Sequence, residues 1–186
     1  MAAKSNLLNM VLCLTLTCLA CSAVLGGIYA MTKEPIDQTN AKILSDSIKA
    51  VLPEGGELSG AKTEGDLEYY EYNAGGAVTA YAVKSTTSGF GGPLTLMVGV
   101  LPDGTVYNTS VLSHTETPGL GAKCTTDPVF TEQWKNFGPE KILAVKKDHG
   151  DVDAITASTI TSRAYTEAVK QAVDLVKSLA KEDGNE

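Results

Sequence analysis

The chain has 186 residues and a formal net charge of −7, with 43% hydrophobic and 20% charged residues. This composition is typical of a folded chain rather than a disordered one. The acidic balance argues against binding to nucleic acid or to anionic lipid through a charged surface, because both need a basic face. Two histidines (His114 and His149) and one cysteine after residue 31 (Cys124) leave little for a zinc site.

An uncharged apolar run covers residues 7–31 and is long enough to cross a membrane as one helix. Lys4 is the only charge before Lys33, so we expect residues 1–6 to stay in the cytoplasm and the body of the chain to be exported. A cleaved signal peptide and lipoprotein processing at Cys21 are two rival interpretations. Both fit less well, because the apolar run continues past any processing site.

A second amphipathic pattern follows in residues 32–56. Its apolar residues recur at helical spacing between Ile36 and Leu52, and Pro53 then ends the pattern. We expect Pro35 to end the membrane helix, because proline breaks a helix interior. The sequence therefore predicts a separate linker helix within residues 32–56.

Residues 57–182 have the pattern of one α+β domain. Runs rich in Tyr, Val and Thr predict two strand pairs, whose turns contain Gly-Gly or Pro-Asp-Gly. The predicted strands are Leu67–Tyr72, Ala77–Lys84, Leu94–Leu101, Thr105–Ser113 and Ile142–Val145, with a short helix at Phe130–Phe137. An amphipathic helix from about Thr159 to Lys181 closes the domain, and residues 183–186 are expected to fray. This order favours a twisted antiparallel sheet packed by helices.

The segment Asp153–Thr161 carries four hydroxyl residues where the last helix is expected to begin. On physical grounds alone, helix capping is the first interpretation, because Thr and Ser accept hydrogen bonds from the free amides of a helix. A phosphate site is the alternative, since the same amides and the helix dipole favour an anion. Capping needs only one or two of the hydroxyls, and small residues at Ala157 and Ser158 allow a phosphate to approach the backbone.

Two glycine-rich segments follow or precede predicted strands. The Pro-Gly pair in His114–Gly121 indicates a turn. Alternatively, its glycines allow a flat ligand to approach the backbone closely, and Glu116 is then an acid near that ligand. Ser88–Pro93 is a flexible strand entry and matches neither a Walker loop nor a dinucleotide fingerprint. Cys124 is expected to be a quiet residue, since its proximity to His114 in sequence is no evidence of a catalytic pair.

Taken in order, these segments resemble the FMN-binding domain family of bacterial respiratory complexes, and within it the G-subunit family of the Rnf complex, an ion-translocating ferredoxin:NAD oxidoreductase. The motifs that carry the resemblance are the N-terminal span, Thr32–Ile36, Gly89–Pro93, Leu94–Val100 before Asp103-Gly104, Glu116–Gly121, and Asp153-x-x-Thr156-Ala157-Ser158-Thr159. The last is a flavinylation motif, in which Ala157 and Ser158 replace the commonest Gly-Ala pair.

The resemblance implies a covalent flavin. FMN is expected to be joined through its phosphate to the hydroxyl of Thr159, with Thr161 as the alternative acceptor. A separate flavin transferase makes this bond from FAD with a divalent metal, and it reads a signature that includes Asp153. The loop Glu116–Gly121 is expected to line the flavin, with Thr117 and Leu120 in contact. The other expected cofactor-binding residues are Pro118, Gly119, Thr156 and Ser158.

The implied function is electron transfer in a membrane complex. We expect a single-pass subunit of the cytoplasmic membrane, with its FMN domain on the extracytoplasmic (periplasmic) side. It relays electrons among the other membrane and redox subunits, while ferredoxin:NAD oxidoreduction is coupled to sodium or proton translocation. One alternative is the C subunit of the sodium-translocating NADH:quinone oxidoreductase, which shares the domain and the motif. The other is a non-redox exported binding module on the same fold.

Overall fold

The computed structural model describes residues 7–183 of the chain. The predictions for residues 1–6 and for 184–186 of the tail therefore lie outside the described residues. The chain divides into two compact units, Met1–Ile43 and Leu44–Glu186. The first contains most of one long helix, and the second contains the sheet and the remaining helices.

Helix α1 runs from Leu7 to Val51. Within residues 7–183 it is the one helix that is long and apolar enough to cross a membrane, by length and composition. The predicted break at Pro35 is wrong, because the helix continues through this residue. Proline removes the backbone donor to the Met31 carbonyl, but its own carbonyl still accepts, and here the Thr39 hydroxyl donates to it at 2.8 Å.

The second unit is built on an antiparallel sheet with the order β1-β3-β4-β5-β6, in which β2 also pairs with β3. Its strands are β1 (Glu57–Leu58), β2 (Lys62–Glu64), β3 (Leu67–Ala74), β4 (Ala77–Ser88), β5 (Pro93–Val100) and β6 (Val106–His114). Its helices are α2 (Lys123–Thr126), α3 (Pro128–Glu132), the 3-10 turn η1 (Lys146–Asp148) and α4 (Thr159–Asp183). The α+β prediction is confirmed. Strands β1 and β2 were not predicted, because two or three residues are too few to show a pattern.

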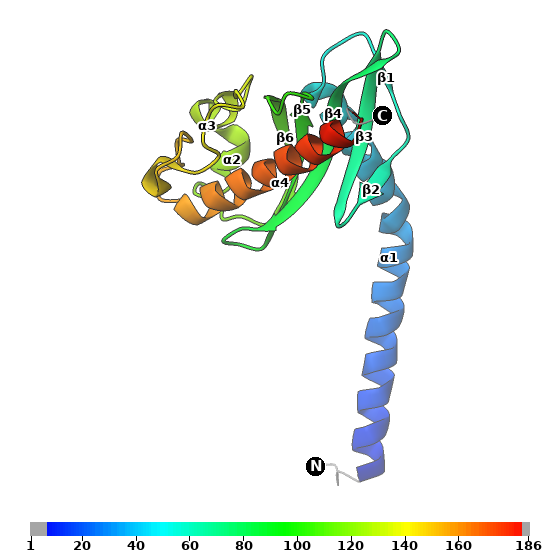
Figure 1. Cartoon of the computed structure of the whole chain (residues 1–186). Coiled ribbons are helices and arrows are strands. Elements are labelled where there is room, and N and C mark those ends of the chain that lie inside the picture. The colour runs from blue at the N-terminus through cyan, green and yellow to red at the C-terminus, as the bar shows by residue number, and fades with distance from the viewer. Residues whose placement is uncertain (1–6, 184–186) are drawn as a thin grey trace. The chain divides into compact units, whose positions relative to one another are not determined.

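The sheet buries both of its faces, since side chains alternate along each strand. Val83 of β4 and Leu96 of β5 face α4, which crosses one side of the sheet (Figure 1). On the other side, Met97 of β5 packs with Ile48 and Val51 from the last turns of α1. Residues 44–52, expected within a linker, therefore contribute to the core of the domain.

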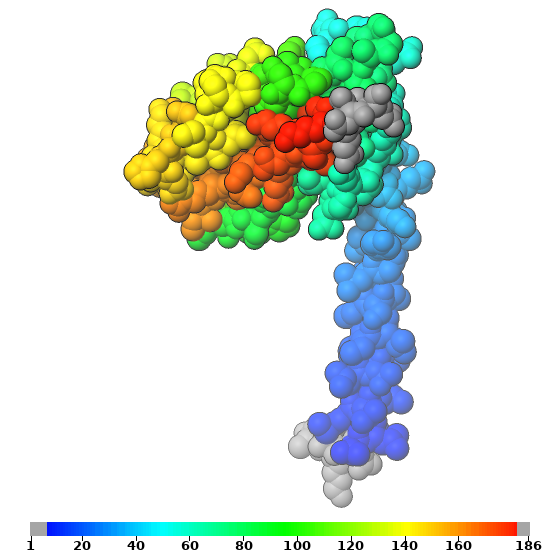
Figure 2. Space-filling model, viewed as in Figure 1, coloured from blue at the N-terminus to red at the C-terminus, as the bar shows by residue number. Residues whose placement is uncertain are grey.

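The segment between α3 and α4 contains little regular structure. The predicted strand Ile142–Val145 is wrong, because Val145 forms only an isolated bridge with Val152. Val145 is instead buried from a loop, 1% exposed in the core beneath α4, whereas Ile142 is 59% exposed. The predicted helix Phe130–Phe137 is shorter than expected, since α3 begins at Pro128 and ends at Glu132. Figure 2 shows these loops (yellow) beside the N-terminal half of α4 (orange).

The contact between β5 and the end of α1 gives a test of this packing. A methyl group at Gly99 overlaps the backbone carbonyl of Val51, so Gly99→Ala is expected to lower the free energy of unfolding by about 1–3 kcal/mol. Urea unfolding of the full-length protein in detergent, followed by fluorescence of the buried Trp134, measures this change. Gly60→Ala is the control, because nothing lies within 4 Å of its added methyl group. Equal stability of the two variants contradicts the packing.

Candidate functional site

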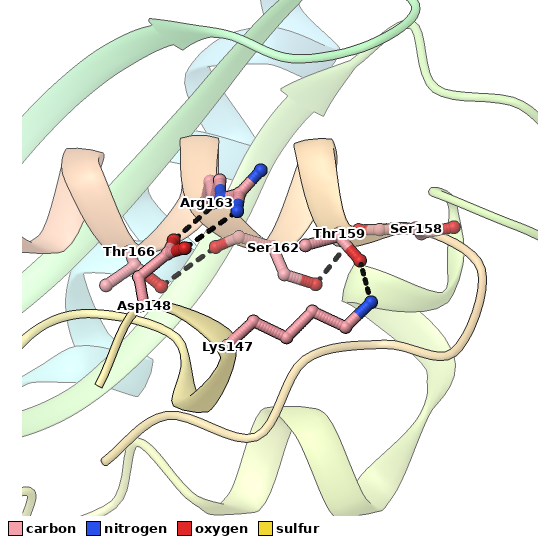
Figure 3. Close-up of polar contacts among 7 residues, drawn as sticks. All are labelled: Lys147, Asp148, Ser158, Thr159, Ser162, Arg163 and Thr166. Carbon is pink, nitrogen blue, oxygen red and sulfur yellow. Dashed lines mark hydrogen bonds and ion pairs between the residues drawn. The ribbon is translucent and has the colours of Figure 1, made fainter. Parts of the chain in front are cut away.

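The N-terminus of α4 is held by a hydroxyl inside the helix. Ser162 Oγ donates to the Ser158 carbonyl at 3.0 Å and accepts from the Ile155 amide at 2.9 Å. The Ser158 carbonyl also accepts the first helical bond, from the Ser162 amide at 3.0 Å. Figure 3 shows Ser162 directed at Ser158, with Thr159 at the start of the helix. This arrangement fixes the loop before Thr159 without using the Thr159 hydroxyl.

The first amides of α4 are available to an anion. Among residues 7–183, the backbone N–H groups of Thr159, Ile160 and Thr161 have no hydrogen-bond partner. Such amides point along the helix axis, and the positive end of the helix dipole lies beside them. A helix of 25 residues has a fully developed dipole, so this terminus suits a phosphate group.

Ala157 precedes this terminus in a left-handed conformation, with φ of 62°. This conformation is strained for a residue with a Cβ and unstrained for glycine. Glycine is the commonest residue at this position of the flavinylation motif that the sequence resembles. The left-handed conformation of Ala157 gives a physical reason for that preference.

Glu116 joins two glycine-rich loops. Its side chain is buried, with the residue 6% exposed, and it accepts hydrogen bonds from the amides of Phe90 at 2.8 Å and Gly91 at 3.3 Å. A methyl group at Gly89 or at Gly121 overlaps the Glu116 carboxylate. The two glycines therefore make room for a carboxylate that ties the loop before β5 to the loop after β6.

A pocket of about 330 Å³ lies between these loops and the start of α4. Side chains of Phe90, Leu120 and Ile160 give it apolar walls, and Thr159 lies at its edge with the helix amides. Its complete lining is Phe90, Glu116, Thr117, Leu120, Gly121, Ala157, Ser158, Thr159, Ile160 and Thr161. The volume is within the range of small-molecule sites, and an apolar wall beside a polar end suits a flat ring system with an anionic tail.

The structure brings most of the predicted site residues together and leaves others apart. The predicted residues that line the pocket are Glu116, Thr117, Leu120, Gly121, Ser158 and Thr159, together with the alternative acceptor Thr161. Pro118 and Gly119 are exposed and do not line it. Thr156 and Asp153 are also exposed outside it, and Asp153 pairs with Lys146 at 2.7 Å.

Three residues of this region were not expected from the sequence. Phe90 is 69% exposed at the pocket, and its only signal was an aromatic residue inside a glycine-rich strand entry. Ile160 is 52% exposed, which is unusual for a large apolar residue in the first turn of a helix. No sequence pattern pointed to Ser162, since its hydrogen bonds to Ile155 and Ser158 form only when the loop before α4 folds back onto the helix.

A second, larger cavity of about 740 Å³ lies along α4. It shares Ile160 with the first pocket, but its lining is more polar and includes Arg163, Glu167 and Lys170. Charged side chains and an open shape make it a poorer match for an apolar ring.

Cys124 is buried in the core close to Glu116. Its burial, followed by the nearby Glu116 charge, raises the pKa of the thiol to about 11. The thiol is therefore protonated at neutral pH, and only the thiolate is a good nucleophile. This environment agrees with the expectation that Cys124 is an unreactive residue.

Comparison of this chain with known proteins shows which family it is similar to. The model of the FMN-binding domain matches residues 89–174, which include Phe90, the 116–121 loop and the start of α4. The G subunit of the proton-translocating ferredoxin:NAD(+) oxidoreductase complex of Clostridium ljungdahlii is 33% identical over 165 residues, covering 88% of this chain and 88% of that protein. The G subunit of the ion-translocating oxidoreductase complex of Vibrio vulnificus is 35% identical, covering 89% of this chain and 88% of that protein. The crystal structure of Shewanella oneidensis NqrC is 21% identical, with a TM-score of 0.46, and covers 69% of this chain and 71% of that chain.

The conformation of Ala157 predicts a stabilising substitution. Ala157→Gly is expected to raise the free energy of unfolding by about 1 kcal/mol, because glycine adopts a positive φ without strain. Urea unfolding of the full-length protein measures it. Ala154→Gly is the control: its φ is not positive, so glycine there is expected to lower stability. A loss of stability in both variants contradicts the strain.

The raised pKa of Cys124 predicts protection from alkylation. We expect the Cys124 peptide to stay unmodified by a maleimide in the native protein at mildly alkaline pH, and to react in concentrated urea. Peptide mass spectrometry measures both states. Because the native pKa lies above that of the unfolded thiol, the unfolded state loses the proton first. The contribution of Cys124 to stability is therefore present below about pH 9 and lost as the pH rises towards about 11. Rapid labelling of the native thiol would show that it is neither buried nor protonated.

Proposed function

The chain belongs to the G-subunit family of ion-translocating ferredoxin:NAD(+) oxidoreductase complexes, and from this premise we propose that it is an electron-transfer subunit that carries FMN. In this proposal it relays electrons between other redox centres of an Rnf-type complex and completes no reaction alone. The complex couples ferredoxin:NAD oxidoreduction to sodium or proton translocation. The observation that carries the proposal is the pocket that joins Thr159 to the 116–121 loop.

The residues of the pocket fit an FMN group. Phe90, Leu120 and Ile160 offer apolar surface to the ring system, and the unpartnered amides of residues 159–161 suit the phosphate. Bound FMN supplies the capacity to accept electrons and pass them on, which no side chain of the pocket has. The protein contributes the position of the ring, the exclusion of water by the apolar walls, and the charge at the phosphate end.

We place a covalent linkage at Thr159 rather than Thr161. Thr159 is partly exposed at the edge of the pocket, whereas Thr161 is 1% exposed, and a separate enzyme needs access to the hydroxyl that it modifies. Thr159 Oγ1 forms a bond to the flavin-side phosphorus of FAD, the pyrophosphate bond breaks, AMP leaves, and the hydroxyl proton passes to the flavin transferase. A threonine hydroxyl is a weak nucleophile unaided, which supports a helper enzyme.

The exposed part of the motif suits recognition by that transferase. Asp153 and Thr156 lie on the surface before α4 and outside the pocket. Their side chains are therefore accessible to an enzyme before the flavin is attached. We propose that they belong to the signature it reads, and that the transferase brings the divalent metal.

Helix α1 is proposed as the membrane anchor. Its apolar residues 7–31 span the cytoplasmic membrane once, with the N-terminus in the cytoplasm. The FMN domain then lies on the extracytoplasmic side, where other membrane and redox subunits of the complex are its partners. The covalent bond keeps the flavin on that side whatever its free concentration.

Substitution of the acceptor tests the linkage. With active flavin transferase, the full-length chain is expected to gain one FMN less one water on the Thr159 peptide, and Thr159→Val is expected to lose this gain completely, because valine keeps the shape and removes the hydroxyl. Intact-mass and peptide mass spectrometry measure it. Thr161→Val is the matched control and is expected to keep the gain. A gain that moves to Thr161 corrects the acceptor, and a wild-type chain without added mass overturns the covalent linkage.

A further inference from the structure

Lys147 lies beside the proposed acceptor. Its ammonium donates a hydrogen bond to Thr159 Oγ1 at 3.1 Å, across a separation of 12 residues in sequence. Figure 3 shows the Lys147 side chain running from the turn η1 towards Thr159 at the start of α4. A group bonded to Thr159 Oγ1 therefore begins within reach of a flexible cation.

The turn that carries Lys147 is fixed to α4 and to its preceding loop. Asp148 accepts two hydrogen bonds from Arg163, at Nε and at Nη2, both at 2.7 Å. The Arg163 guanidinium lowers the pKa of the Asp148 carboxyl, so this pair stays ionised at neutral pH. Lys146, on the other side of Lys147, pairs with Asp153 at 2.7 Å. Two ion pairs therefore flank Lys147 and bring its backbone to the start of α4.

Lys147 attracts the Asp148 carboxylate only at longer range and forms no salt bridge among the described residues. Lys146 and Arg163 each have a carboxylate partner, but no salt bridge joins Lys147 to a carboxylate among residues 7–183. Its ammonium bonds instead to the neutral hydroxyl of Thr159. A threonyl phosphodiester keeps one negative charge and adds acceptor oxygens, and an ammonium binds such oxygens more strongly than it binds a hydroxyl.

We infer that Lys147 is the residue that holds the phosphoryl group at Thr159, and that the Asp148–Arg163 ion pair positions it there. This inference rests on the proposed function, since it concerns the same linkage. The α4 amides take the phosphate from the helix side, and Lys147 takes it from the side of η1. During attachment the same cation stabilises the negative charge on the oxygens of the phosphoryl group that Thr159 Oγ1 attacks.

The experiment uses the purified full-length chain in detergent, with limiting flavin transferase, FAD and Mg²⁺. Lys147→Gln is expected to slow the initial rate of mass gain about tenfold or more, because a charge-assisted bond is lost. Lys147→Arg is expected to restore most of the rate. Lys170→Gln is the matched control and is expected to keep it, since it removes an exposed lysine of α4 away from Thr159. A second readout is the phosphorus-31 resonance of the flavinylated proteins, which is expected to shift in Lys147→Gln and stay in place in Lys170→Gln.

Each contrary outcome has a separate meaning. Equal rates and equal phosphorus resonances for wild type and Lys147→Gln overturn the inference and leave the linkage standing. A slow rate that arginine does not restore, with an unchanged resonance, also overturns it, because Lys147 then serves contact with the transferase rather than the phosphate. A wild-type chain that gains no FMN overturns the proposed linkage on which the inference rests.

Discussion

The packing of α4 across the sheet is the interaction on which the site depends. One face of the helix is buried on β4 and β5 by small and branched residues, among them Ala168, Val169 and Ala172. Tyr165, at its N-terminal end, stacks on Trp134 with ring centroids 5.3 Å apart and donates to the Thr109 hydroxyl at 2.8 Å. A large aromatic residue with a satisfied hydroxyl resists both rotation and sliding of the helix. The position of the helix N-terminus, and so of the proposed acceptor, is therefore fixed by the core.

Two polar contacts with different environments then hold the loops around that terminus. Glu116 is buried and bonded to backbone amides, so the glycine-rich loop before β5 cannot move without leaving those amides unpaired. The Asp148–Arg163 pair is exposed and worth little as an isolated surface ion pair, but its two short bonds define the position of one turn. Glu116 therefore fixes the loops that line the smaller pocket, whereas Asp148 and Arg163 line the larger cavity along α4.

The elements that depend on local pattern could be predicted from the sequence. The four long strands and α4 followed from alternation, turn residues and helical periodicity, and the hydroxyl-rich segment was correctly expected where the last helix begins. The predicted helix end at Pro35 was wrong, because the loss of one backbone donor does not end a helix when the residues on both sides stay helical. The strand predicted at 142–145 was wrong because Val145 is buried from a loop and Ile142 is exposed, so the apolar run is not one face of a strand. Phe90 and Lys147 were not predicted as part of the site, since their roles arise from contacts across 26 and 12 residues of chain, to Glu116 and to Thr159.

A flavin joined to Thr159 is proposed to lie in the pocket between the 116–121 loop and the start of α4. Two cavities meet at Ile160, so a ring tethered to Thr159 has a choice between them. A crystal structure of the flavinylated protein distinguishes the two positions. We predict density for the ring system against Phe90, Leu120 and Ile160. Density for the ring along Arg163 and Lys170 in the larger polar cavity, with Phe90 and Leu120 uncovered, would contradict the proposed position of the flavin.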